Sequence, residues 1–365
     1  MDPRIRDHAE VLVHHSADIG AGDTVVVSAP PVAEDLAVAI YEELAQVGAT
    51  PVMTYGGDTS LGADRAARAY LKHADEDDLA NPDHLQALYE ASDATIRVRA
   101  HENVTERADV ASGKSAAYQK AIQETRHELL STTWVLTQYP APADAQLAGM
   151  STAEYADFVY DAVNKDWDEQ REHQAQMVEI LDPADEVRIV SGDHTDLTMS
   201  VSGMKTLNDY GENNLPGGEV FTAPVPDSVE GTVLFDLPLY HQSKEIEDAY
   251  LEFENGEVTG YSASKNEDLL GEVIHTDPGA RRLGELGIGM NRDIDRFTYN
   301  MLFDEKMGDT VHLAVGMAYE ECVPDDVERN DSATHVDMIV DMSEDSRIEV
   351  DGETVQEDGT FVFEE

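Results

Sequence analysis

Short strand-like runs alternate with amphipathic helical stretches over residues 24–139, and this order constrains the fold more than any other feature of the chain. The first run covers residues 24–28 and the second covers residues 51–55. Between them, apolar residues at positions 36, 39, 40 and 44 follow the period of a helix. Such alternation is typical of a parallel sheet with helices packed on its faces. We therefore predict an N-terminal α/β domain with a mostly parallel sheet.

The same pattern continues toward the middle of the chain. Two further strands are predicted at residues 94–98 and 134–137, with one helix between them. A long helical pattern without proline then covers residues 152–181 and leads to a strand at 187–190. Residues 20–23 contain Gly-Ala-Gly, but a dinucleotide-binding fingerprint needs glycines after the strand, where the helix begins. These glycines precede a strand, so we interpret them as a turn.

Beyond residue 190 the pattern changes to strands and hairpins. Residues 196–201 alternate as a strand, and residues 250–261 read as a hairpin whose Asn-Gly pair is a strong turn signal. The C-terminal stretch 347–363 is predicted to form hairpin strands with Asp-Gly turns. We therefore predict two domains, an α/β domain over residues 1–190 and an α+β domain rich in antiparallel sheet over residues 191–365.

The chain is strongly acidic. It has 76 acidic and 24 basic residues, which give a formal net charge of -52 at pH 7. A hydrophobic content of 41% and acids scattered through periodic segments indicate a globular chain rather than a disordered one. Molar salt shortens the Debye length to about 3 Å and removes most of the self-repulsion. We predict adaptation to high salt, as in extreme halophiles; a nucleic-acid mimic is the alternative interpretation.

Two simple features bear on the compartment. The first seven residues lack the apolar run of a signal peptide, and 18 consecutive apolar residues occur nowhere. We expect a cytoplasmic protein with no membrane partner and no nucleic-acid partner. Cys322 is the only cysteine, which excludes an internal disulfide and a thiolate zinc cluster within one chain. We expect Cys322 to be buried and inert.

Two of the thirteen histidines lie in predicted strands, whereas most others lie on predicted helix surfaces. His312 belongs to a predicted strand at residues 310–314, and His335 to another at 334–340. The strand period of two places His335 and Asp337 on one face. That face can offer two metal ligands from a rigid sheet. A pair that faces solvent is the alternative, which these residues alone leave open.

Two glutamates lie among apolar and small residues, which is unusual for surface acids. Glu219 follows a Pro/Gly-rich loop over residues 213–218, and Glu285 is flanked by glycines and leucines over 282–289. An inward-facing carboxylate must be paired or bound to a metal. Zinc and cobalt suit mixed imidazole and carboxylate ligands, while manganese and magnesium suit sets dominated by carboxylates. Among 76 acids, however, either glutamate could be incidental.

Four segments resemble, in the same order, motifs of the thermophilic metalloprotease family of aminopeptidases. These segments are NNLPGGEVFTAP, LGELGIGMN, LFDEKMGDTVHLAVGMAY and SATHVDM. A looser likeness at GDTVVV and EYADFVY extends the resemblance over nearly the whole chain. The resemblance implies a metal-dependent aminopeptidase that acts on short peptides with a free N-terminus. It also implies a homodimer.

The family resemblance further implies two divalent metal ions per chain, for which the mixed imidazole and carboxylate ligands favour zinc. The metal ligands would be Glu219, Glu285, His312, His335 and Asp337, with Glu305 as a further ligand or as the acid/base group. Glu285 would bridge the two ions, and together they would activate a water. Tyr319 falls on the catalytic tyrosine of the family. Whether Glu219 or Glu305 takes the proton from the water stays open at the level of sequence.

One geometric condition and two alternatives accompany this hypothesis. Tyr319 is seven residues after His312, which is the wrong parity for one face of a straight strand, so we predict a bulge or a bend at Gly316. A metal-binding protein that has lost catalysis is one alternative. A two-metal phosphoesterase is another, but it needs cations around a phosphate. Lys306 is the only cation beside the motifs, and it could equally be a surface lysine.

Overall fold

The structure is a computed structural model that describes residues 1–56, 61–241 and 244–364. The chain forms two compact units. The first contains residues 1–165 and 211–217, and the second contains residues 166–210 and those from 218 onward. The division therefore falls at residue 165, and not at residue 190 as the change in sequence pattern suggested.

A break between two helices explains why the units divide at residue 165. Residues 152–181 form two helices, α8 (Thr152–Val163) and α9 (Trp167–Leu181), and not the single helix that we predicted. Asp166 caps the second helix by accepting a hydrogen bond from the backbone N–H of Glu169 at 3.0 Å. Within α9, the side-chain amide of Gln174 donates to the backbone oxygens of Asp209 and Glu219, each at 2.9 Å. These bonds tie α9 to the second unit.

The first unit contains the predicted parallel sheet, in the strand order β2-β1-β3-β4-β8. Its strands are β1 (Thr24–Ala29), β2 (Thr50–Tyr55), β3 (Ala94–Arg99), β4 (Thr133–Gln138) and β8 (Asn214–Leu215). Every neighbouring pair is parallel. The prediction of an α/β domain with a mostly parallel sheet is confirmed.

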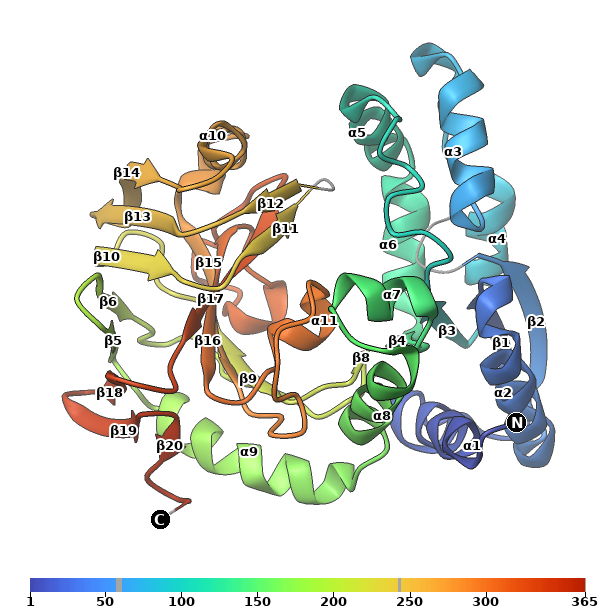
Figure 1. Ribbon diagram of the computed structural model, residues 1–365, viewed down its shortest axis with the longest axis horizontal. Coiled ribbons are helices and arrows are strands. Elements are labelled where there is room, and N and C mark those ends of the chain that lie inside the picture. Colours follow the sequence, from blue (N-terminus) through green and yellow to red (C-terminus); the bar gives the residue numbers. More distant parts are fainter. Residues whose placement is uncertain (57–60, 242–243, 365) are drawn as a thin grey trace. The chain divides into compact units, whose positions relative to one another are not determined.

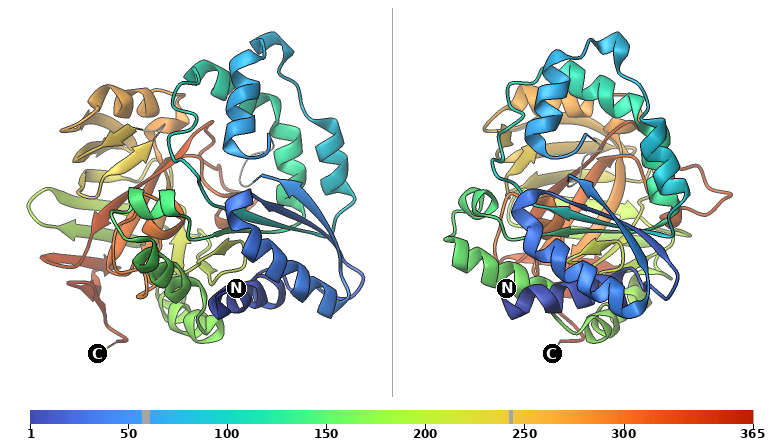
Figure 2. Two further views of the ribbon diagram at one scale, coloured as in Figure 1. Left: turned by 45° about the vertical axis from the view of Figure 1, so that its right-hand side comes forward. Right: turned by 90° about the vertical axis from the view of Figure 1, so that its right-hand side faces the viewer.

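Helices cover both faces of this sheet (Figures 1 and 2). The first unit contains, besides α8, the helices α1 (Pro3–Glu10), α2 (Glu34–Val47), α3 (Asp64–His73), α4 (Asp83–Glu90), α5 (Ser112–Ala121), α6 (Gln123–Ser131) and α7 (Pro142–Leu147). Of these, α3 and α5 pack on each other through Leu71 and Tyr118. Helix α2 buries Leu36, Ile40 and Leu44, while α4 and α6 pack on Val26 from the other face. The single helix expected between β3 and β4 is two helices, which meet at Ile122.

The second unit contains an antiparallel sheet in the order β14-β13-β10-β6-β5-β18-β19-β20. The strands are β5 (Glu186–Ser191), β6 (Thr195–Ser200), β10 (Glu230–Phe235), β13 (Ala249–Glu254), β14 (Glu257–Ser262), β18 (Ser346–Val350), β19 (Glu353–Glu357) and β20 (Thr360–Phe361). At the predicted hairpin, Asn255 and Gly256 have φ values of 51° and 76°, as a type I′ turn requires. The prediction of a C-terminal unit rich in antiparallel sheet is confirmed.

A second antiparallel sheet in this unit positions the candidate site (Figure 1). Its order is β17-β16-β15-β9-β7, and its strands are β7 (Leu207–Asp209), β9 (Glu219–Thr222), β15 (Leu283–Gly289), β16 (Thr310–Gly316) and β17 (His335–Asp341). Alternate residues such as Leu286, Leu313 and Met338 pack in one apolar core with residues of the first antiparallel sheet. The intervening residues therefore lie on the opposite face.

Candidate metal centre

The predicted ligands share that opposite face of adjacent strands. Ala314 pairs with both Glu285 and Asp337 across the sheet, and Gly316 pairs with His335. Because side chains alternate along each strand, this register places the following residues on one face: Glu219, Glu285, His312, His335 and Asp337. The structure thus brings together five residues from four strands, β9, β15, β16 and β17.

The first ligand set, which we call the buried group, consists of Glu219, Glu285 and His312. Its residues are 6%, 4% and 0% exposed. The Nε2 atom of His312 lies 3.2 Å from Glu219 Oε2 and 3.2 Å from Glu285 Oε1. Two carboxylate oxygens and one imidazole nitrogen therefore converge on a small volume.

The second ligand set, which we call the half-buried group, consists of Glu285, His335 and Asp337. His335 Nε2 lies 3.3 Å from Glu285 Oε2 and 3.4 Å from Asp337 Oδ1. His335 Nδ1 donates to the backbone oxygen of Met317 at 2.8 Å, which turns Nε2 toward the carboxylates. Glu285 belongs to both groups and offers a different oxygen to each.

A glycine makes room for the histidine of the buried group. A Cβ atom at Gly287 would lie 2.0 Å from His312 Nε2, so only glycine lets the imidazole cross this strand. Gly287 also pairs with His312 in the register of the sheet. Our sequence reasoning did not identify Gly287. The available signal was its position two residues after Glu285, on the same face of the strand.

Lys306 lies inside the centre and not on the surface, which excludes the interpretation as a surface lysine. Its side chain is 0% exposed, and its Nζ atom lies 2.9 Å from Glu219 Oε1 and 2.5 Å from Glu305 Oε1. Asp209 Oδ2 is 3.7 Å away. Burial lowers the pKa of Lys306, but these carboxylates outweigh burial and raise it well above its ordinary value. Lys306 is therefore a fixed cation among carboxylates.

Glu305 lies outside both ligand groups. It follows the short helix α11 (Met301–Asp304), and its Oε1 atom contacts Lys306. Its predicted role as a metal ligand or as the acid/base group stays a prediction. The cluster also contains Asp209, which pairs with Glu219 in the sheet and which the sequence did not single out.

Protons and charges are tightly shared in this centre. Burial lowers the pKa of His312, but the hydrogen bond to Glu285 and the charge of Glu219 raise it to about 9. For His335, Asp337 and Glu285 likewise outweigh burial and raise the pKa to about 12. Burial raises the pKa of Asp337, but the neighbouring His335 lowers it to about 2. A cation that binds here must therefore displace protons from the imidazoles.

The predicted bend at Gly316 is present and places Tyr319 beside the half-buried group. Gly316 ends strand β16 with a φ of 107°. The side-chain amide of Asn330 donates to the Gly316 oxygen at 2.6 Å, and the backbone N–H of Ala318 donates to the Asn330 oxygen at 3.0 Å. These bonds hold the turn after the strand. The Tyr319 ring then lies 4.9 Å from the His335 ring, measured between centroids.

The donor set fits a divalent metal. Glu219 Oε2 and Glu285 Oε2 are buried and have no hydrogen-bond partner among the described residues. Leaving such oxygens unpaired is costly, and a cation between them and the imidazoles would satisfy both. Oxygen and nitrogen donors without thiolates suit zinc, cobalt or manganese.

Comparison with known proteins identifies the family. The model of the family described as "Thermophilic metalloprotease (M29)" matches residues 1–365. This chain belongs to the thermophilic metalloprotease (M29) family. The predicted family and enzyme class, a metal-dependent hydrolase of peptide bonds, are thereby confirmed, and the family implies a divalent metal cofactor.

Several relatives span nearly the full chain. Aminopeptidase 2 of Geobacillus stearothermophilus is 28% identical, over 95% of this chain and 93% of its own length. Aminopeptidase T of Thermus aquaticus is 27% identical, over 97% of this chain and 95% of its own. The solved structure of wild-type AmpT from Thermus thermophilus has the same fold, with a TM-score of 0.86, 24% identity and 99% of both chains covered.

Cys322 is buried, as predicted. No helix in the described part of the chain is long and apolar enough to cross a membrane.

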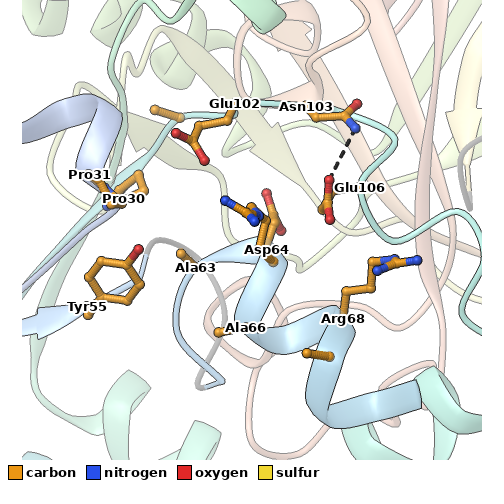
Figure 3. Close-up of a pocket in the computed structure, with 13 residues that line it drawn as sticks. Pro30, Pro31, Tyr55, Ala63, Asp64, Ala66, Arg68, Glu102, Asn103 and Glu106 are labelled. Carbon is orange, nitrogen blue, oxygen red and sulfur yellow. Dashed lines mark hydrogen bonds between the residues drawn. The ribbon is translucent and has the colours of Figure 1, made fainter. Parts of the chain in front are cut away.

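A cavity of about 670 Å³ lies in the first unit, where strands β1, β2 and β3 end (Figure 3). Pro30, Tyr55 and Glu102 line it from the strand ends, and Asp64 and Arg68 line it from α3. All its lining residues belong to the first unit, whereas all the predicted ligands belong to the second.

Proposed function

We propose that this protein is an aminopeptidase that uses two divalent metal ions to release N-terminal residues from short peptides. The observation that carries the proposal is that Glu285 belongs to both ligand groups and faces each with a different oxygen. A shared carboxylate of this kind is typical of two-metal hydrolases, whose ions lie about 3.5 to 4 Å apart. The names of the relatives support the peptide substrate.

The charge of the centre supports two ions. Its carboxylates belong to Asp209, Glu219, Glu285, Glu305 and Asp337. Lys306 offsets one of these five negative charges when the imidazoles are neutral. Two divalent cations would offset the remaining four.

The side chains around the centre have separable tasks. Bound divalent ions would activate a water and polarise the scissile carbonyl. Tyr319 would donate a hydrogen bond to the oxyanion that forms from this carbonyl, a contribution of about 3 kcal/mol. Partial burial and, after it, the charge of Glu285 raise the pKa of Tyr319 well above its ordinary value. The hydroxyl therefore stays protonated and can donate this hydrogen bond.

We assign the general base to Glu305 in preference to Glu219. Glu219 Oε1 accepts a hydrogen bond from Lys306, and Oε2 faces the buried ligand group beside His312, where a metal ion would bind it. Glu305 lies outside both ligand groups, and only its Oε1 atom contacts Lys306. Its other oxygen can take a proton from water and pass it to the leaving amine. The acidic surroundings also favour the α-ammonium group of a peptide with a free N-terminus.

The alternatives lack comparable support. A phosphoesterase needs cations that reach the phosphate, but three carboxylates surround the ammonium group of Lys306. A centre that had lost catalysis would not need Tyr319 beside His335, nor Asn330 to hold the intervening turn.

Four further features belong to this proposal. We propose zinc as the cofactor, adaptation to high salt and a cytoplasmic location. We also propose a homodimer. The edge strand β2 supports an interface between copies, because Val52, Met53 and Tyr55 are exposed along it.

The test begins with protein purified in molar KCl and stripped of metal with a chelator. Metal-free protein should not cleave leucine p-nitroanilide, and added zinc or cobalt should restore cleavage. The N-acetylated substrate and p-nitrophenyl phosphate should stay intact. His335→Ala and Glu285→Gln should each lower kcat/KM at least 1000-fold, while the exposed Lys265→Ala serves as control. Full activity of the metal-free protein would refute the proposal, and activity of either variant within tenfold of the parent would remove that residue from the centre.

A further inference from the structure

We propose that the two metal positions are unequal, and that the half-buried group binds its ion more tightly than the buried group. This inference rests on the proposed two-metal function and adds a property that the ligand sets alone do not reveal. Each group consists of two carboxylates and one imidazole, with Glu285 common to both. The difference must therefore come from the residues that contact the ligands.

The two imidazoles have different outer partners. His335 Nδ1 donates to the Met317 oxygen at 2.8 Å, which fixes the ring and makes Nε2 a better donor. His312 Nδ1 is buried and has no hydrogen-bond partner among the described residues. Losing an outer partner of this kind typically lowers metal affinity by about 10-fold to 100-fold. The imidazole of the half-buried group is therefore the stronger ligand.

The two carboxylates that are not shared also differ. Glu219 Oε1 receives a hydrogen bond from the ammonium group of Lys306 at 2.9 Å, so only Oε2 is available to an ion. The ammonium group withdraws charge from this carboxylate and repels a second cation nearby. Asp337 contacts His335, and no lysine or arginine in the described part of the chain forms an ion pair with it. Both carboxylate and imidazole thus favour the half-buried group.

Two further carboxylates limit the effect of Lys306. Glu305 and Asp209 lie 2.5 Å and 3.7 Å from its Nζ atom and offset part of its charge. Lys306 therefore weakens the buried position without abolishing it. At limiting metal, the chain should hold one ion at the half-buried group and lack full activity. Occupancy of the buried group would then control turnover.

Titration of metal-free protein with cobalt in molar KCl tests this order. Calorimetry should resolve two binding events per chain whose Kd values differ at least tenfold, and the visible absorption of cobalt should report each event separately. Asp337→Asn should remove the tighter event, and Glu219→Gln the weaker one. Lys306→Met should strengthen the weaker event at least tenfold. The matched control is Lys265→Met, since Lys265 is an exposed lysine that also contacts two glutamates; it should change neither event.

Each outcome decides one question. Two events of equal affinity, or loss of the tighter event in Glu219→Gln, would overturn the inequality. One ion per chain or none would instead overturn the two-metal function. Circular dichroism should show whether Lys306→Met folds. If it does not, the comparison of Asp337→Asn with Glu219→Gln still assigns the tighter and the weaker binding event to the two ligand groups.

Discussion

Gly287→Ala gives the sharpest test of how the sheet builds the buried group. The new Cβ would lie 2.0 Å from Nε2 and from Cε1 of His312, whereas ordinary contact begins at 3.4 Å, so the ring must move by about 1.4 Å. His312 is 0% exposed and cannot move into solvent. Overpacking of this kind costs about 1 to 3 kcal/mol of stability. Metal sites tolerate changes in ligand distance of only about 0.2 Å, so the buried group should lose its ion.

Three measurements follow this substitution. Metal analysis after dialysis should show one ion per chain in Gly287→Ala and two in the parent, because the half-buried group does not contain His312. Urea unfolding of metal-free protein in molar KCl should show the loss of stability. Aminopeptidase activity should fall at least 1000-fold. In the matched control, Gly20→Ala, the new Cβ would contact only Asp23 at 3.6 Å, and all three quantities should stay at parent values.

A double variant separates the clash from the lost ligand. Gly287→Ala combined with His312→Ala should regain most of the stability, because the smaller side chain removes the overlap, but it should regain neither the second ion nor the activity. If Gly287→Ala alone keeps two ions and parent activity, then the imidazole does not need the space over Gly287, and our account of the buried group is wrong.

The remaining predictions concern the turn, pH and salt. Asn330→Ala removes the bond that holds Gly316, so kcat should fall about 10-fold to 100-fold with unchanged metal content. Tyr319→Phe removes the oxyanion donor itself, so kcat should fall about 100-fold to 1000-fold, again with unchanged metal content. A loss of metal in either variant would contradict this assignment. Burial lowers the pKa of His8 to about 3, so as pH falls below about 6.5 the unfolded chain binds this proton first and stability declines. By linkage, the free energy of unfolding should fall by about 2 kcal/mol at pH 5 because of His8. Urea unfolding at pH 7.5 and pH 5 should therefore show a smaller loss of stability in His8→Gln than in the parent. An equal loss in both proteins would contradict the burial effect. With a net charge of -52, dialysis from molar to 50 mM KCl should abolish the far-UV circular dichroism of the fold, and an unchanged spectrum would refute adaptation to high salt.

Local patterns were sufficient for most strands and turns. The hairpin at Asn255 and Gly256 was predictable because both residues tolerate the positive φ that a type I′ turn requires. The two helix breaks differ in this respect. The break at Ile122 carries no local signal, because Ile122 is neither a proline nor a glycine and has no capping side chain. The break before α9 does carry one, since Asp166 followed by Glu169 is a typical helix start, which the prediction of one continuous helix overlooked.

The sequence by itself determined the alternating α/β unit, the antiparallel character of the second unit, the family and the set of candidate ligands. These depend on periodicity and on motif order, which are properties of contiguous residues. Only the tertiary structure divided the ligands into two groups that share Glu285, and only it showed Lys306 buried among carboxylates. The physical reason is that these relations are set by the register between strands and by side chains that meet across the sheet. Such contacts join residues far apart in the chain, and no local pattern encodes their distances.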